Sequence, residues 1–289
     1  MSIRVYIDGQ MREPEAAVVS VFDRGFLFGD SVYETIALLD GRLLFLAEHL
    51  DRLERSASRI YLELPARAQV ERAIRETIQA AEEMNARIRV MVTRGQGGVD
   101  LDPATAGAPR LIVIVQPLGA PTAEMLESGV AVAVVKASRI AGGRVDPAVK
   151  SGNYLGSVLA IGEARRRLPG VNEAIMCSGN GSVAEGATSN VFMVEGGELK
   201  TPALEVGILD GVTRGKVLEL ARGAGLEARE LSFIAPDSLS TADEIFLTSA
   251  VRGILPVTSV DGRRIGNGRP GPVTRRLMAL YQRLASEAS

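Results

Sequence analysis

Residues 149–164 read VKSGNYLGSVLAIGEA, which places Lys150 directly before a run of small and polar residues. Lysine is scarce in the chain: only positions 136, 150, 200 and 216 hold it, and the other 33 − 4 = 29 basic residues are arginine. A desolvated amine can lose its proton and attack a carbonyl to form a Schiff base, whereas a guanidinium keeps its proton. The small side chains at 151–153 would let a flat ligand approach the backbone. The stretch therefore favours a reactive lysine, and a solvated loop lysine is the simpler alternative.

Length and composition limit the class of protein. With 289 residues, of which 46% are hydrophobic, the chain can bury a substantial core, which we expect in two domains. A formal net charge of −2 provides neither a basic field for nucleic acid nor a polybasic patch for membranes. No apolar run approaches the roughly 20 residues of a membrane span. Met1 leads directly into a predicted strand and turn, IRVYIDGQ, instead of a targeting segment. We expect a soluble cytoplasmic protein.

The chain contains one histidine and one cysteine. His49 lies in LAEHLDRLERSASRIYL (46–62), a helical pattern with Leu50 and Leu53 on its apolar face. A single cysteine, Cys177, excludes an intrachain disulfide and a cluster of metal thiolates. Zinc chemistry and Ser–His–Asp hydrolysis are therefore poorly supported, and no metal is expected. We interpret His49 as a packing or capping residue, which leaves lysine as the natural proton carrier of an enzyme.

Hydrophobic periodicity predicts a mixed α/β chain with many strands in its second half. The segment VYETIALLDGRLLF (32–45) is typical of a hairpin that turns at Asp40-Gly41. Helices are predicted at 46–62, 67–84, 152–168, 212–223 and 272–285. Strands are predicted at 87–95, 110–118, 129–138, 173–177, 190–195, 226–232, 244–249 and 254–260. The Pro- and Gly-containing segment PLGAPTAEM (117–125) predicts a linker at 119–126 between domains 1–118 and 127–289. No G-x-G-x-x-G follows a strand, which argues against a Rossmann dinucleotide site.

Three motifs in this order resemble the class IV aminotransferases: VKSGNYLGSVLAIGEA (149–164), GSVAEGATSNVFMV (181–194) and GILDGVTRGKVLELA (207–221). These are the fold-type IV pyridoxal-phosphate enzymes, which include branched-chain aminotransferases, D-amino-acid aminotransferases and aminodeoxychorismate lyase. The resemblance extends from FDRGFLFGDSVYET (22–35) to DGRRIGNGRPGPVT (261–274). It implies a smaller N-terminal α/β domain and a larger, strand-rich pseudo-barrel domain, with pyridoxal 5'-phosphate (PLP) in the cleft between them. It also implies a homodimer in which the partner's N-terminal domain lines part of each site.

The resemblance assigns roles around the ring of the cofactor. Lys150 would form the aldimine with PLP and then carry the proton between the substrate α-carbon and C4′ of the cofactor. Glu185 would face the pyridine nitrogen, where an anion keeps the ring protonated so that it accepts carbanion charge. Tyr154 would hydrogen-bond the phenolic oxygen, and Leu209 would pack on the ring. The simpler alternatives are a surface acid for Glu185 and a core aromatic residue for Tyr154.

The remaining cofactor contacts concern the phosphate. The Val212 N–H and the Thr213 hydroxyl stand at a predicted helix N-terminus, which is a favourable anion site. Arg52 matches the phosphate arginine of the family, and its alternative is an exposed helix charge. The loop LTSAVRG (247–253) would add contacts from Ser249 and Ala250. Branched-chain enzymes usually have a threonine in place of Ala250, so only backbone N–H groups remain there. Thr188 completes the cofactor-binding set.

The substrate is predicted from a smaller number of positions. D-amino-acid aminotransferases of the Bacillus type carry an Arg-x-His carboxylate trap where this chain has Val99 and Leu101. Apolar residues there favour a hydrophobic pocket for a branched-chain L-amino acid, with a 2-oxo acid such as 2-oxoglutarate as acceptor. The predicted substrate residues are Phe28, Tyr33, Val99 and Leu101 for the side chain, and Val251, Ala250, Arg87 and Arg89 for the carboxylate.

Other features leave alternatives open. Arg87 replaces a usual tyrosine, VYETI replaces the usual FEGIR, and the loop after Lys150 is one residue shorter than in branched-chain enzymes. Arg24 and Arg87 would be able to supply a different carboxylate trap. A D-amino-acid or (R)-amine transaminase and a lyase on the same cofactor therefore remain alternatives. A non-enzymatic α/β binding protein is disfavoured by the intact motif set.

Overall fold

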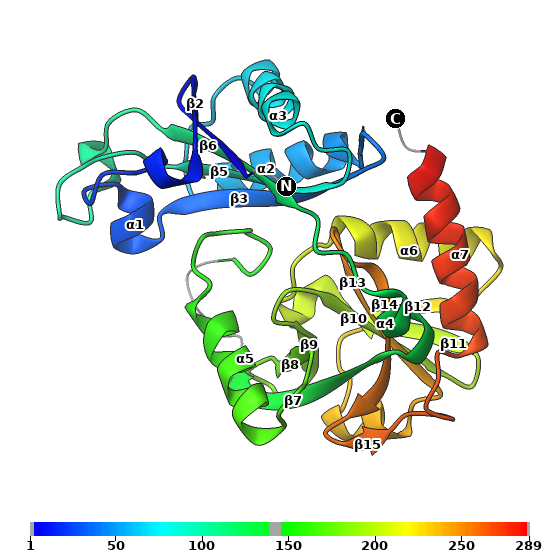
Figure 1. Cartoon of the computed structure of the whole chain (residues 1–289). Helices are drawn as coiled ribbons and strands as arrows, with labels where there is room; N and C mark the ends of the chain where they lie inside the picture. Colours follow the sequence, from blue (N-terminus) through cyan, green and yellow to red (C-terminus); the bar gives the residue numbers. More distant parts are fainter. Residues whose placement is uncertain (1–2, 139–145, 288–289) are drawn as a thin grey trace. The chain divides into compact units, whose positions relative to one another are not determined.

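The computed structural model describes residues 3–138 and 146–287 (Figure 1). The chain packs as two units. Unit 1 contains the chain up to Gly119 together with Val149–Asn153, and unit 2 contains Ala120–Ala148 and Tyr154–Glu287. The segment that holds Lys150 therefore packs with unit 1, although it lies within the predicted range 127–289.

Unit 1 is built on a six-stranded antiparallel sheet. Its strands in order are β2 (Gln10–Arg12), β1 (Arg4–Ile7), β6 (Arg110–Pro117), β5 (Ala86–Thr93), β3 (Ser31–Leu39) and β4 (Arg42–Leu43). The other elements are α1 (Arg24–Phe28), α2 (Leu46–Arg59), α3 (Arg67–Ala81) and the short turns at Pro14–Ala16 and Pro103–Thr105. Helices α2 and α3 pack on one face of this sheet and bury the core of the unit with it (Figure 1).

The turn between β3 and β4 has the predicted position and chemistry. Asp40 and Gly41 both have positive φ, 48° and 78°. Two left-handed residues are what a two-residue hairpin turn requires, because their twist matches that of the strands. This turn directs the chain from β3 into α2, so the two elements pack against each other.

The two faces of β3 have different neighbours, and this difference positions the site. Strand residues alternate between the faces of a sheet. Glu34 lies on the face covered by α2, together with Val32 and Ile36 of the core. Tyr33 lies on the opposite face, next to Arg89 of β5. A single dipeptide of β3 thus contributes one side chain to the helix-covered layer and one to the other surface.

Unit 2 contains a mixed sheet of nine strands. Their order is β12 (Ala228–Leu231), β11 (Glu198–Pro202), β10 (Asn190–Glu195), β13 (Glu244–Ser249), β14 (Gly253–Val260), β7 (Val130–Ser138), β8 (Glu173–Cys177) and β9 (Val183–Gly186), with β15 (Arg263–Arg264) paired to β14. The helices are α4 (Ala123–Ser128), α5 (Leu155–Arg167), α6 (Val212–Gly223) and α7 (Pro272–Glu287), and short helical turns occur at Leu204–Val206 and Pro236–Thr241. Helix α5 packs on β7 and β8, while α6 and α7 pack on each other and on β13.

Most predicted elements occur at or near their expected positions, and three differ. The helix predicted at 152–168 begins only at Leu155, because the residues before it pair with β3 through Ser151 and Gly152. Strand β9 was not predicted, since its four residues are too short for a periodic signal. The predicted linker at 119–126 includes the beginning of helix α4. No helix within residues 3–138 and 146–287 is long and apolar enough to cross a bilayer.

Candidate active site

Lys150 is held at its backbone from two sides within unit 1. Its N–H donates to the hydroxyl of Ser56 on α2 at 3.1 Å, and its carbonyl accepts from the N–H of Tyr33 on β3 at 3.0 Å. The preceding residue, Val149, is buried in the core of the unit. Lys150 is thus not an unconstrained loop lysine, because a strand and a helix together fix where its side chain starts.

The Lys150 amine and the Arg89 guanidinium contact the same aromatic ring. The Nζ atom lies 4.6 Å from the centroid of the Tyr33 ring, and the guanidinium carbon of Arg89 lies 3.9 Å from it. Tyr33 itself is buried. Cations at these distances are attracted by the electron-rich ring face. The structure therefore brings three predicted residues together: a reactive amine, a cation that can bind a carboxylate, and the ring between them.

Arg52 is buried, in contrast to the alternative of an exposed helix charge. Its Nε and Nη2 atoms donate to the two carboxylate oxygens of Glu34, both at 2.7 Å. The Nδ1 atom of His49 lies 2.8 Å from Oε2 of the same carboxylate. Glu34 is fully buried, and His49 and Arg52 are 1% and 5% exposed. The three residues form one buried polar network, which we call the Glu34 network.

Electrostatics determine the protonation of the Glu34 network. Burial opposes ionisation of Glu34, but Arg52 and His49 outweigh it and hold the pKa of this carboxyl far below its usual range. Burial lowers the pKa of His49 below its ordinary value and prevails over the neighbouring carboxylate, which would raise it. At neutral pH the network therefore holds one anion, one cation and one neutral imidazole. A neutral imidazole next to a carboxylate carries its proton on the facing nitrogen, so Nδ1 donates to Glu34.

Arg24 belongs to a structural network of hydrogen bonds. Its Nε donates to Asp30 at 3.1 Å, and its Nη1 and Nη2 donate to the carbonyls of Asp100 and Leu101 at 3.0 and 3.4 Å. Asp30 also accepts from Arg94 at 2.8 and 3.0 Å. Burial alone would raise the pKa of Asp30, but the two guanidiniums hold it below its ordinary value. Arg24 thus anchors the loop after β5.

The other predicted substrate residues are less uniform in their surroundings. Phe28 packs under the Arg24 guanidinium, 5.0 Å from the ring centroid. Val99 and Leu101 are 68% and 77% exposed on the loop that Arg24 anchors, and unit 1 does not bury them with Tyr33. Arg87 is half-buried on β5, and its Nε has no hydrogen-bond partner among residues 3–138 and 146–287.

In unit 2, Glu185 is a buried strand residue and not a surface acid. It lies on β9 and is 6% exposed. Its Oε2 accepts from the backbone N–H of Leu209 at 2.8 Å and from the Asn190 amide at 3.3 Å, and this amide also donates to the Leu209 carbonyl at 2.9 Å. The carboxylate and the predicted ring-packing residue are therefore held against each other.

Helix α6 begins three residues after Leu209, with Gly211 as its cap and Val212 as its first residue. Thr213 is buried in this first turn. The unpaired N–H groups of a helix N-terminus attract anions. Unit 2 therefore places a buried carboxylate and an anion-binding helix end close together along one short segment, which fits a ligand with a protonated ring nitrogen and a phosphate.

The remaining predicted cofactor residues lie at three places in unit 2. Ser249 ends β13, and Ala250 and Val251 form the turn into β14. Tyr154 directly precedes α5 and is half-buried. The hydroxyl of Thr188 donates to Glu173 at 2.7 Å and accepts from Arg252 at 2.9 Å. Thr188 is thus part of an ion pair between Glu173 and Arg252, which are 2.8 Å apart.

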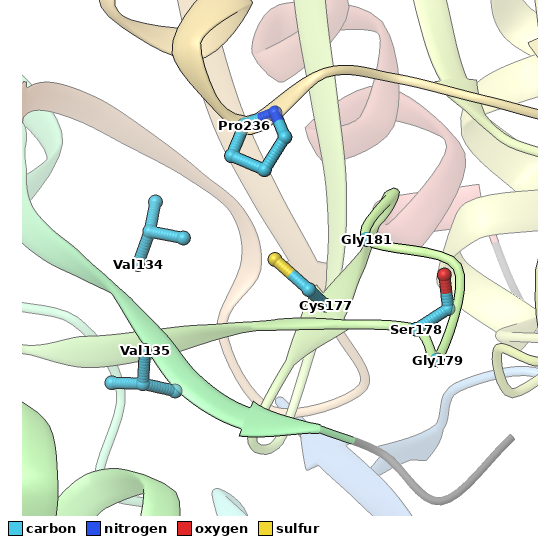
Figure 2. Close-up of a pocket in the computed structure, with 7 residues that line it drawn as sticks. All are labelled: Val134, Val135, Cys177, Ser178, Gly179, Gly181 and Pro236. Carbon is cyan, nitrogen blue, oxygen red and sulfur yellow. The ribbon is translucent and has the colours of Figure 1, made fainter.

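A cavity of about 390 Å³ lies elsewhere in unit 2 (Figure 2). Its lining contains none of the predicted site residues: Val134, Val135, Cys177, Ser178, Gly179, Gly181 and Pro236. The Cys177 thiol points toward Val134 and Pro236 (Figure 2). Burial raises the pKa of this thiol, which disfavours the reactive thiolate. Within the described residues, no group of three His, Cys, Asp or Glu side chains forms a metal site.

Sequence reasoning missed the partners of the predicted residues. Glu34 and Asn190 were not recognised, although each contacts a predicted residue directly. For Glu34 a signal was present, because an acid in the apolar strand VYETIALL must be paired when it is buried. For Asn190, nothing in the local pattern distinguishes a polar strand residue from a turn residue.

The comparisons with known proteins agree with this geometry. A model of the family "Amino-transferase class IV" matches residues 31–260. A putative branched-chain-amino-acid aminotransferase of Methanocaldococcus jannaschii is 37% identical over 97% of this chain and 96% of its own length. A D-alanine aminotransferase of Bacillus licheniformis is 32% identical over 99% of both chains.

Solved structures are similar over nearly the whole length. The branched-chain amino acid aminotransferase of Escherichia coli has a TM-score of 0.93 at 33% identity and covers 100% of this chain and 96% of its own. A branched-chain amino acid aminotransferase from T.th., solved with pyridoxamine 5'-phosphate, has a TM-score of 0.92 at 28% identity and covers 99% and 95%.

Proposed function

The chain belongs to the class IV aminotransferases, and we propose that it moves the amino group of a branched-chain or similarly hydrophobic L-amino acid to a 2-oxo acid such as 2-oxoglutarate. Membership in this family confirms the predicted enzyme class, the fold-type IV architecture and the cofactor, since class IV aminotransferases use PLP. The substrate and the role of each residue are the proposal.

The observation that carries the proposal is the position of Lys150. Its backbone is fixed by Ser56 and Tyr33, and its amine rests against the ring that Arg89 also contacts. A reacting amine and a carboxylate-binding cation against one ring are what an amino-acid substrate requires. PLP, when bound, supplies an aldehyde and a pyridine ring that accepts the electron pair of the substrate α-carbon. We assign to the Lys150 amine the covalent attachment of the cofactor and the transfer of the α-proton.

Glu185 is proposed to hold the proton on the pyridine nitrogen. Its burial supports the assignment, because a buried carboxylate interacts strongly with a facing N–H. The contacts of Glu185 with Leu209 and Asn190 orient the carboxylate and place Leu209 for packing on the ring. Tyr154 is proposed to donate to the phenolic oxygen.

We assign the phosphate to donors from both units. Unit 2 would contribute the amides of Val212 and Ala250 and the hydroxyls of Thr213 and Ser249. Unit 1 would contribute the guanidinium of Arg52. The burial of Thr213 and the start of α6 at Val212 support this assignment. Thr188 is proposed to act less directly, through Arg252, with which it is hydrogen-bonded.

The exposure of Val99 and Leu101 bears on the substrate pocket. Two large apolar side chains on an anchored loop are best explained by a second copy of the chain that covers them. We therefore propose a homodimer in which these residues, with Phe28 and Tyr33, enclose the substrate side chain. On α5 the exposed apolar residues Leu155, Val158 and Leu159 offer further surface for such an interface. Ala250 and Val251 are proposed to bind the α-carboxylate through their amides, with Arg89 near.

A D-amino-acid or (R)-amine transaminase is the second candidate. Arg87 favours it, because a half-buried guanidinium whose Nε has no partner within the described residues is suited to an additional carboxylate. The D-alanine aminotransferase among the relatives agrees with this candidate. Arg24 supports it less, since its three donor atoms already hold Asp30 and the loop at 100–101.

A substrate panel tests both candidates. PLP-loaded protein is incubated with 2-oxoglutarate and with L-leucine, D-alanine, (R)-1-phenylethylamine or aminodeoxychorismate, and the oxo products are measured. We expect the largest kcat/KM for L-leucine. Turnover of D-alanine well above that of L-leucine would replace the first candidate by the second. Pyruvate formation from aminodeoxychorismate without consumption of 2-oxoglutarate would indicate a lyase.

A further inference from the structure

We propose that Glu34 is a positioning residue that fixes the Arg52 guanidinium as a donor to the phosphate of the cofactor, with His49 as the second partner of the carboxylate. The inference rests on the proposed phosphate role of Arg52 and adds two residues that act through it. It predicts a specific defect: loss of the preference for phosphorylated over unphosphorylated cofactor.

The hydrogen bonds of Glu34 determine the orientation of the Arg52 side chain. Both carboxylate oxygens bind one edge of the guanidinium, through Nε and Nη2, at 2.7 Å. A planar guanidinium held at two atoms has no freedom to rotate. Its remaining corner, Nη1, is thereby directed away from Glu34. Since Glu34 belongs to β3 in the interior of the sheet, the plane of the guanidinium is set by the sheet and not only by the helix that carries Arg52.

Stability alone does not explain this arrangement. Removing two charges from water costs about as much free energy as their attraction returns, so apolar residues of similar volume would serve a core equally well. Around Glu34 the core is otherwise apolar, with Val32, Ile36, Leu50 and Leu53 all buried. A buried ion pair there has a use if the arginine needs a fixed direction.

His49 completes the coordination of the carboxylate. Its Nδ1 donates to Oε2 at 2.8 Å, which prevents the carboxylate from turning away from Arg52. His49, Arg52 and Ser56 lie at helical spacing on α2, so they share one face of the helix. Ser56 holds the backbone of Lys150 at 3.1 Å. The same helix face therefore positions the phosphate arginine and the reactive lysine.

The test compares the affinities of the full chain for PLP and for pyridoxal, which lacks the phosphate, by absorbance titration after removal of the cofactor. The readout is the ratio of the two dissociation constants, because general damage to the site weakens both ligands alike. The variants are Arg52→Ala, Glu34→Gln, Glu34→Asp and the double variant Glu34→Gln/Arg52→Ala. Glu34→Asp keeps the buried charge balanced, so it guards against simple unfolding, while its shorter side chain displaces the guanidinium. Asp30→Asn is the matched control, since Asp30 also pairs with two arginines in unit 1.

We expect Arg52→Ala to lower the ratio at least about tenfold, the loss of one charge-assisted contact. Both Glu34 variants should lower it to within about threefold of that value, the double variant should lower it no further, and Asp30→Asn should keep the wild-type ratio. Wild-type ratios in both Glu34 variants, or additive losses in the double variant, would overturn the inference. An unchanged ratio in Arg52→Ala would instead refute the proposed phosphate role on which it rests.

Discussion

Acidification from pH 7.5 to 5.5 should destabilise the chain through its single histidine, His49. The imidazole is 1% exposed, and burial holds its pKa below the ordinary value of 6.5. In the unfolded chain the imidazole binds a proton below about pH 6.5, whereas in the folded chain it stays neutral to lower pH. The folded state is therefore fully favoured above pH 6.5 and loses stability as the pH falls toward the folded pKa.

The magnitude follows from proton linkage. One pH unit below the unfolded pKa, a histidine that remains neutral in the folded state costs up to about 1.4 kcal/mol of unfolding free energy. Glu34 and Asp30 do not contribute in this range, because their pKa values lie below ordinary carboxyl values and both remain ionised. His49→Gln removes the titration, while its amide can still donate to Glu34.

Urea unfolding of wild type and His49→Gln at pH 7.5 and 5.5, with saturating PLP, measures the effect. The wild type should lose up to about 1.4 kcal/mol more than the variant over this interval. In proton NMR, the single histidine ring should titrate with a midpoint below 6.5. An equal loss of stability in His49→Gln, or a midpoint at or above 6.5, would refute the reasoning.

Four further predictions concern the proposed site. Lys150→Ala should abolish turnover and the lysine–cofactor adduct that borohydride reduction and peptide mass mapping detect in wild type; an adduct retained at another lysine would reassign the reactive amine. Glu185→Gln should slow α-proton exchange far more than it weakens PLP binding, and unchanged exchange with weakened binding would make Glu185 structural. Thr213→Ala should weaken PLP about tenfold and pyridoxal little, since a phosphate contact is lost, and equal weakening of both would place Thr213 away from the phosphate. Val99→Arg should lower kcat/KM for L-leucine, because an unpaired cation would enter an apolar pocket, and undiminished kcat/KM would remove Val99 from that pocket.

Much of the fold was predictable because its signals are local. The hairpin turn at Asp40-Gly41 is specified by two residues that tolerate positive φ, and helix α6 begins and ends where its periodicity does. Lys150 was recognisable for the same reason, as one of four lysines placed before small residues. Signals of this kind lie within a few residues of the position that they concern.

The partners of these residues were decided only by the tertiary structure. Glu34 meets Arg52 because β3 turns directly into α2 and the helix packs on that face of the strand. Lys150 meets Ser56 across 94 residues of chain, so no short window of sequence contains the pair. The sequence by itself determined which segments become strands, helices and turns and which side chains carry the chemistry. The register in which those segments pack decided which charges are paired and buried, because a hydrogen bond between distant segments exists only after their surfaces have met.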